Sequence, residues 1–210
     1  MDDRREAVLL LHGLWMNRLA MLYLGRVLAR SGFAPVSLSY RSMRGGIDEH
    51  VADIGECIAS IPAEVVHLVG HSFGGAVALR YLQQAPDARV GRTVLLGSPV
   101  IGSGAALSLA RRPGGRVLLG TSLAIWQSEL DLAIGERYCV GAIAGSRPLG
   151  LARLVVRLAG PNDGVVTVKE TRLPALADHI VLPVSHSGML VSAKVARQTA
   201  AFLRLGRFER

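Results

Sequence analysis

The residues with the clearest chemical potential are Gly70-His71-Ser72-Phe73-Gly74, which follow the apolar run Val65–Val69 and precede a helical pattern reaching about Gln84. A serine that acts as a nucleophile between a strand and a helix must lie on a very tight turn in strained backbone. Glycines two positions before and after the serine leave room for that turn, because side chains there would collide with the strand and the helix. The pattern predicts Ser72 as a nucleophile. The structural alternative is a glycine-rich turn with an idle serine.

Serine is a weak nucleophile and needs a base, together with an acid that orients the base. In a strand–turn–helix arrangement of this kind, the acid and then the histidine follow the serine along the chain. His186 lies just after the apolar run Ile180–Val184, at the carboxyl end of an expected strand, where open α/β sheets place reacting groups. His179 begins that run and is expected at the strand edge. The sequence therefore predicts His186 as the base.

Three aspartates are candidates for the orienting acid. Asp163 lies in the turn-rich segment Gly-Pro-Asn-Asp-Gly-Val-Val, far enough before His186 for one crossover and one strand. Asp178 directly precedes the strand that leads to His186, so it is expected at the opposite end of that strand. Asp131 is a more distant third candidate. An aspartate in a glycine-rich loop can also be only a turn former, but the position favours Asp163.

Acyl transfer places negative charge on a carbonyl oxygen, and preorganised backbone N–H donors stabilise it by a few kcal/mol each. One expected donor is the amide of Phe73, at the start of a helix where the helix dipole favours an anion. The other is the amide of Leu14, or of Trp15, in the loop Leu-His-Gly-Leu-Trp-Met-Asn after the first apolar run. Trp15, Met16 and His71 are expected to line the substrate pocket.

The elements that position these residues form a regular alternation of apolar runs and helical patterns. Runs such as Val-Leu-Leu-Leu are apolar without interruption, which indicates strands buried on both faces of a parallel sheet covered by helices. The sequence predicts one α/β domain over residues 1–210, with a mostly parallel open sheet of about six strands and helices on both faces. The expected strands are Ala7–Leu11, Pro35–Ser39, Val65–Val69, Thr93–Leu96, Tyr138–Ala144 and His179–Val184; the expected helices cover about 18–30, 48–61, 72–84 and 191–205.

Two segments interrupt the alternation. Residues 101–136 combine glycines with apolar clusters, which predicts short helices in a lid or cap insertion above the strand ends. Residues 145–160 are expected to form a loop or a short helix.

Composition narrows the classes of partner. The net charge is +8 and comes almost wholly from arginine. This charge could attract anionic substrates, acyl-carrier groups or, weakly, anionic membranes, but plain surface solubility explains it more simply. Aromatic residues make up only 5% of the chain, which argues against binding to single-stranded nucleic acid by base stacking.

The location and the cysteines also follow from the composition. The apolar runs are far shorter than the roughly 20 residues of a membrane span, and the charged first residues do not resemble a signal peptide. A cytoplasmic location is therefore expected. Cys57 and Cys139 are expected to be buried free thiols.

Four sequence blocks resemble those of small bacterial lipases and esterases of the α/β-hydrolase superfamily: LLLHGLWMN, GHSFGGAVAL, NDGVV and VSHSGM. They extend from the first expected strand to the last helix. The resemblance implies the α/β-hydrolase fold, with Ser72 as nucleophile, Asp163 as acid, His186 as base, and the amides of Leu14 and Phe73 as oxyanion donors. The chain departs from a minimal lidless lipase in the length of residues 101–136. No secretion signal is visible in it, so a secreted lipase is not expected.

The expected activity is hydrolysis of a small ester or thioester with an apolar acyl part, through an acyl-enzyme on serine. No metal or organic cofactor is expected, because the histidines and cysteines lack zinc-ligand spacing. Three alternatives remain: an acyltransferase that uses the same acyl-enzyme, a non-catalytic binding protein, and a peripheral protein that docks on anionic lipid. The natural substrate and the oligomeric state stay open.

Overall fold

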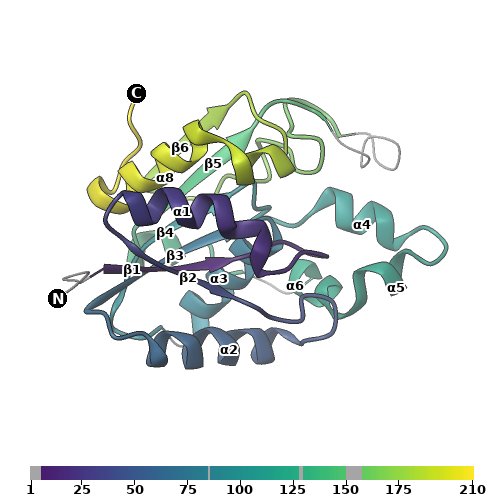
Figure 1. Cartoon of the computed structure of the whole chain (residues 1–210). Helices are drawn as coiled ribbons and strands as arrows, with labels where there is room; N and C mark the ends of the chain where they lie inside the picture. The colour runs from purple at the N-terminus through teal and green to yellow at the C-terminus, as the bar shows by residue number, and fades with distance from the viewer. Residues whose placement is uncertain (1–5, 85, 128–129, 150–157) are drawn as a thin grey trace.

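The computed structural model describes residues 6–84, 86–127, 130–149 and 158–210 of the chain. In these residues six parallel strands form one sheet in the order β2-β1-β3-β4-β5-β6 (Figure 1). Their bounds are β1 Glu6–Leu11, β2 Ala34–Leu38, β3 Val65–His71, β4 Val90–Leu96, β5 Val140–Gly145 and β6 Asp178–Leu182. The predicted α/β class is confirmed, and the sheet is wholly parallel rather than mostly so.

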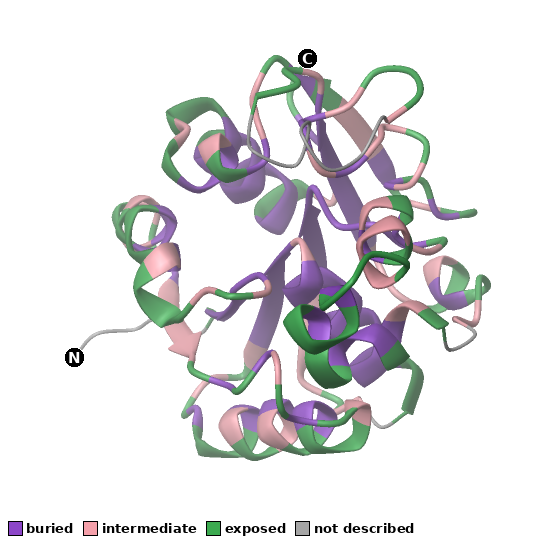
Figure 2. Ribbon diagram, turned by 90° about the vertical axis from the view of Figure 1, so that its right-hand side faces the viewer, coloured by how far each residue is buried: buried purple, intermediate pink, exposed green. Residues whose placement is uncertain are grey.

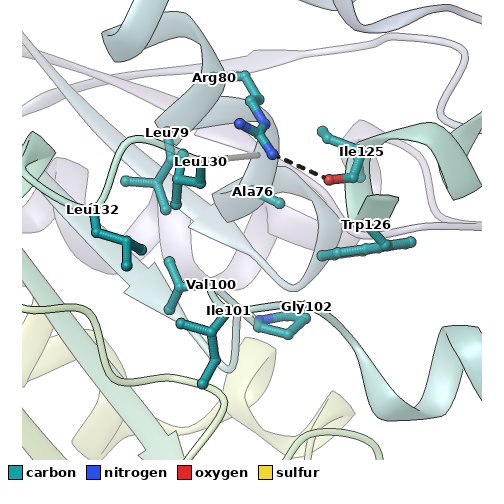
Figure 3. A pocket seen from close by; sticks show the side chains of 11 residues that line it. Ala76, Leu79, Arg80, Val100, Ile101, Gly102, Ile125, Trp126, Leu130 and Leu132 are labelled. Atoms are coloured by element: carbon teal, nitrogen blue, oxygen red, sulfur yellow. Dashed lines mark hydrogen bonds between the residues drawn. The ribbon is translucent and has the colours of Figure 1, made fainter. Parts of the chain in front are cut away.

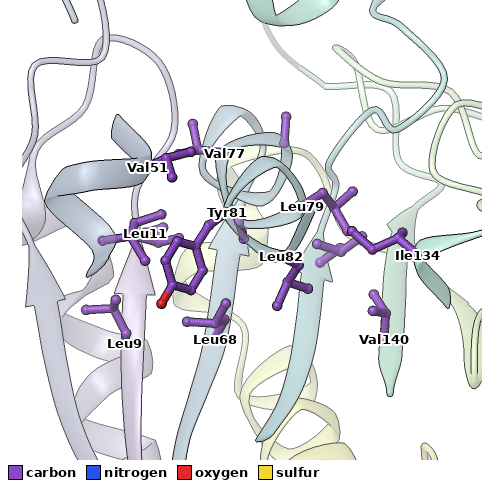
Figure 4. Packing of buried hydrophobic residues seen from close by; sticks show 14 of the residues in the cluster. Leu9, Leu11, Val51, Leu68, Val77, Leu79, Tyr81, Leu82, Ile134 and Val140 are labelled. Atoms are coloured by element: carbon purple, nitrogen blue, oxygen red, sulfur yellow. The ribbon is translucent and has the colours of Figure 1, made fainter. Parts of the chain in front are cut away.

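Uninterrupted apolar runs form these strands because successive side chains point to opposite faces of the sheet, and both faces are covered. In β1, Leu9 and Leu11 enter one hydrophobic cluster while Val8 and Leu10 enter another on the opposite face. The first cluster also contains Tyr81 and other residues from α2 (Ile47–Ser60) and α3 (Phe73–Gln84) (Figure 4). The second contains residues of α1 (Leu22–Arg30) and α8 (Ala193–Leu205).

The helices therefore lie in two layers, α2 and α3 on one side of the sheet and α1 and α8 on the other, as expected (Figure 1). Buried ribbon is concentrated in the sheet and on the inner sides of these helices (Figure 2). Short 3₁₀ helices precede α1 and α8: η1 (Arg18–Met21) and η4 (Ser187–Val191). The last α-helix begins at Ala193 rather than near Val191, because Ser192 caps it by accepting a hydrogen bond from the amide of Val195.

The segment 101–136 forms short helices, as predicted: α4 (Gly104–Ala110), α5 (Gly115–Leu119), η2 (Gly120–Ser122), α6 (Leu123–Gln127) and the start of α7 (Ile134–Arg137). The insertion contacts loops that follow the strands. Trp15 Nε1, after β1, donates a hydrogen bond of 2.8 Å to the carbonyl of Leu118. Thr121 Oγ1 donates one of 2.7 Å to the carbonyl of Gly45, after β2. Helices α5 and η2 therefore lie at the carboxyl end of the sheet.

Two further expectations concern single segments. In the region predicted as a loop or short helix, residues 150–157 lie outside the described residues. Cys57 and Cys139 are free, but both are half-buried rather than buried. They pack against the two clusters on opposite faces of the sheet, so they cannot approach each other. In the described ranges, none of the helices has the length and apolarity that crossing a membrane requires.

Candidate active site

Ser72 lies at the junction of β3 and α3 with a backbone φ of 54°. A residue with a β-carbon in this left-handed region stores roughly 1–3 kcal/mol of strain and persists only where the surroundings hold it. Here the amide of Ser72 donates to the carbonyl of Leu96 at 2.9 Å, and its carbonyl accepts from the amide of Gly75 at 3.1 Å. The sequence prediction of a strained turn at Ser72 agrees with this geometry.

Three glycines make this turn sterically possible. A β-carbon on Gly70 would lie 2.4 Å from the Gly75 backbone, and one on Gly74 would lie 2.3 Å from the carbonyl oxygen of Leu11. One on Gly75 would lie 2.0 Å from Ser98 Oγ. These distances are well inside van der Waals contact, so α3 can begin against β1 and β4 only because these positions lack side chains.

His186 and Asp163 meet at the carboxyl end of the sheet. Their closest atoms, His186 Nδ1 and Asp163 Oδ2, are 2.7 Å apart, and the amide of His186 donates to the Asp163 carbonyl at 3.0 Å. The carboxylate is completely buried. Its other oxygen accepts hydrogen bonds from the amides of Val165 and Val166 at 2.9 and 2.7 Å. A buried carboxylate with these three partners fixes the imidazole ring and places the proton on Nδ1, which leaves Nε2 as an acceptor.

Gly97 creates the space for this pair. A β-carbon on Gly97 would lie 2.9 Å from Asp163 Oδ2 and 3.2 Å from His186 Nδ1, and Gly97 has a φ of +54°. Gly97 lies outside the four sequence blocks that predicted the site. Its position directly after the apolar end of β4 was the available signal.

The rejected candidates lie elsewhere. Asp178 is at the amino end of β6, where its carboxylate accepts from the amide of Phe208 at 2.9 Å and pairs with Arg210 at 2.6 Å. His179 Nε2 is hydrogen-bonded to a threonine hydroxyl at 2.9 Å. Asp131 forms an exposed ion pair with an arginine of α7 at 2.6 Å.

A cavity of about 450 Å³ joins Ser72 and His186, which both line it. Trp15 and Met16 lie in its wall, as expected, and so do Leu14 and Phe73, whose amides were predicted as oxyanion donors. The insertion supplies much of the rest of the wall, mostly with apolar side chains: Ala105, Ala106, Leu109, Leu118, Leu119 and Trp126. The cavity therefore presents the Ser72 hydroxyl and an imidazole in largely apolar surroundings, with Ser103 and Ser187 as further polar wall residues.

His71 does not line this cavity, contrary to expectation. Its side chain is completely buried, and Nε2 donates a hydrogen bond of 3.0 Å to the carbonyl of His186. The two rings lie 4.7 Å apart. Burial, and then the neighbouring His186, lowers the pKa of His71 to about 3. The His71 imidazole thus lies behind His186 and holds its backbone, and its low pKa favours the neutral form. Local sequence gives no means to foresee this contact.

This buried histidine predicts a loss of stability in mild acid. Its pKa is about 3 in the folded protein and ~6.5 in the unfolded chain. Its contribution to stability is therefore present above pH ~6.5 and is lost as the pH falls, by ~1.4 kcal/mol per pH unit, because the unfolded state takes up the proton first. The free energy of unfolding is measured with urea at pH 7.5 and at pH 5. Its decrease between the two pH values should be about 2 kcal/mol smaller in His71→Gln than in wild type. An equal pH dependence in both proteins would contradict the neutral assignment.

The loop after β1 passes directly beside the nucleophile. A β-carbon on Gly13 would lie 3.3 Å from Ser72 Cβ. The Tyr40 hydroxyl donates a hydrogen bond to the backbone carbonyl of His12. The rings of Tyr40 and His12 stack with their centroids 4.3 Å apart. The Tyr40 ring also stacks on Phe73 at 6.3 Å. Tyr40 therefore contacts both segments that were expected to supply oxyanion donors; no motif in the sequence marked it.

Figure 3 shows a second cavity, of about 350 Å³. It shares two wall residues, Pro99 and Trp126, with the first cavity. Its wall is largely apolar and includes Arg80 of α3. Arg80 Nη2 donates a hydrogen bond of 3.3 Å to the carbonyl of Ile125. This bond ties helix α6 of the insertion to the helix that begins at Ser72. In neither cavity, nor elsewhere in the described ranges, do three His, Cys, Asp or Glu side chains gather as metal ligands would.

A family model described as "Alpha/beta hydrolase family" matches residues 8–204. Several solved structures are similar over nearly the whole chain. The mature lipase BlEst2 of Bacillus licheniformis has 18% sequence identity and a TM-score of 0.76, with 97% of this chain and 93% of that chain covered. An esterase of Exiguobacterium antarcticum has 15% identity, a TM-score of 0.70 and coverages of 95% and 92%.

An esterase of Pyrococcus furiosus has 16% identity and a TM-score of 0.69, with 97% of this chain and 83% of that chain covered. No curated protein matches the chain. At these identities the solved structures establish a shared fold.

Proposed function

Because this chain belongs to the alpha/beta hydrolase family, we propose that it hydrolyses carboxylic esters or thioesters through an acyl-enzyme on Ser72. His186 is the base and Asp163 the acid that orients it. The observation that carries this proposal is the 2.7 Å contact between the buried Asp163 carboxylate and His186 Nδ1, because His186 lines the same cavity as Ser72.

The proposed reaction has two halves. His186 Nε2 accepts the proton of the Ser72 hydroxyl while Oγ attacks the substrate carbonyl, and Asp163 stabilises the resulting imidazolium. The tetrahedral intermediate collapses, and the departing alkoxide or thiolate takes that proton from His186. Water, activated by the same imidazole, then attacks the acyl-enzyme and releases the carboxylic acid.

The amides of Leu14 and Phe73 are the proposed donors to the oxyanion. Both residues line the cavity beside Ser72, and Phe73 is the first residue of α3, where backbone N–H groups lack partners within the helix. The apolar walls from the insertion favour an apolar acyl group. The printed names of the similar structures, a lipase and two esterases, support an ester as substrate.

Tyr40 orients the loop that carries the Leu14 donor, through its hydrogen bond to the His12 carbonyl. Tyr40→Phe keeps the stacked ring and removes the hydroxyl. It should lower kcat about fivefold with little change in KM, since the oxyanion interaction strengthens only in the transition state. Tyr81→Phe is a matched control, because the Tyr81 hydroxyl accepts from the amide of Asp87 outside the cavity. A kcat loss of equal size in both variants would contradict the assignment.

The function is tested by covalent labelling with a fluorophosphonate, which reacts with activated serine hydroxyls. Peptide mapping should find the label on Ser72, and p-nitrophenyl esters of graded chain length should protect the site in proportion to their affinity. Ser187→Ala removes another serine of the same cavity and should label normally. Labelling at Ser187, or no labelling of the folded protein, would overturn the proposal.

A further inference from the structure

Large apolar side chains are exposed around the mouth of the cavity. Trp15 is 57% exposed and Leu118 52% exposed, and both line the cavity. The hydrogen bond from Trp15 Nε1 to the Leu118 carbonyl holds these two segments together. Leu19, four residues after Trp15 in the sequence, is 66% exposed. Val117, directly before Leu118, is 80% exposed. We call these four residues the entrance patch.

The charge around the entrance patch has a single sign in both segments that form it. Residues 101–127, which contain Val117 and Leu118, include three arginines and no acidic residue. Residues 13–22, which contain Trp15 and Leu19, include Arg18 and no acidic residue. Arg18, Arg111 and Arg116 are exposed.

The Glu170 carboxylate contacts residues 101–127 from outside. Glu170 accepts a hydrogen bond from the amide of Gly104 at 2.6 Å, and its other oxygen accepts from the amide and hydroxyl of Thr167. Glu170 is half-buried and its oxygens are already bonded. Within residues 13–22 and 101–127, the charged side chains are therefore all positive.

We propose that the entrance patch docks on the surface of a lipid bilayer that carries anionic phospholipid. Tryptophan and aliphatic side chains enter the interfacial region of a bilayer, while arginines at the border contact anionic headgroups. Leu118 and Trp15 belong both to the patch and to the cavity wall, so docking would place the cavity mouth against the lipid. An apolar substrate would then enter from the bilayer without crossing water; this last step rests on the proposed ester hydrolysis.

The charge pattern also argues against a second copy of the chain as the occupant. A symmetric dimer joins the same surface of both subunits. Joined at the entrance patch, two copies would bring Arg18, Arg111 and Arg116 of each near those of the other. Like charges at such an interface are unfavourable, whereas an anionic headgroup layer is complementary.

The test is sedimentation of the full chain with vesicles of phosphatidylcholine alone and of phosphatidylcholine with phosphatidylglycerol. Wild type should bind the second kind at least about tenfold more tightly, and added salt should reduce the difference. Val117→Ser with Leu19→Ser, and separately Arg111→Gln with Arg116→Gln, should each weaken binding about tenfold. None of these residues lines the cavity, so hydrolysis of a soluble short-chain ester should stay unchanged.

Matched controls come from exposed residues far from the mouth. Val181→Ser in β6 and Arg30→Gln with Arg197→Gln, in α1 and α8, should bind as wild type does. Binding is also measured with Ser72→Ala, so the result does not depend on catalysis. Equal binding to both vesicle types, wild-type binding by the patch variants, or a concentration-dependent dimer that Val117→Ser abolishes would overturn the proposal.

Discussion

Replacing Ser72 by alanine should reduce ester turnover at least about a thousandfold, because it removes the hydroxyl proposed to form the acyl-enzyme. The alanine methyl group fits the turn, since the crowded positions are the glycines beside it rather than position 72 itself. Thermal unfolding should therefore change little. The measurement is kcat/KM with a soluble p-nitrophenyl ester, on protein checked for folding by circular dichroism.

Ser187→Ala is the appropriate control for this experiment, because Ser187 lines the same cavity and follows His186 directly. It should retain most of the wild-type rate. If Ser72→Ala kept the rate of Ser187→Ala, the proposed nucleophile would be wrong, whatever the other residues do.

Asp163→Asn should lower kcat by about 10⁴-fold with a small effect on KM. The asparagine oxygen can still accept from the amides of Val165 and Val166, so the loop should keep its shape. Its NH₂ group would face His186 Nδ1 and force that nitrogen to accept. The proton then moves to Nε2, and the imidazole can no longer receive the proton of Ser72.

Asp178→Asn is the control for this variant. Asp178 is also a buried aspartate that accepts a backbone hydrogen bond, but it lies at the amino end of β6, away from His186. Its activity should remain near wild type even if its urea midpoint falls. Comparable losses of kcat in the two variants would show that the effect of Asp163→Asn is structural.

Much of the arrangement could be predicted from local sequence because its causes are local. The turn at Ser72 requires glycines at fixed offsets, and His186 follows a strand whose apolar residues are contiguous. The sequence predicts a strand that begins at Thr93, whereas β4 begins at Val90, because the residues before Thr93 lack a continuous apolar pattern. Val90-Gly-Arg-Thr is not an apolar run, and its pairing with β3 passes through an irregularity between Val66 and Leu68.

The contacts that support the site depend on residues far apart in the chain. His71 and the His186 carbonyl are 115 residues apart, and Tyr40 reaches His12 across 28 residues. The direction of the His71 side chain depends on its hydrogen-bond partner, the His186 carbonyl, which the fold places behind the cavity wall. No periodicity or spacing in the sequence contains that information, so His71 was wrongly expected to line the pocket.

Trp126 lies in the walls of both cavities and has the larger of their two shared side chains, so it bears on how large a substrate the site can hold. A small residue at position 126 would merge both spaces into a single longer chamber, with Arg80 in its far wall. Preference for acyl length, and for a charged acyl terminus, could then change through one mutation that leaves Ser72, His186 and Asp163 as they are.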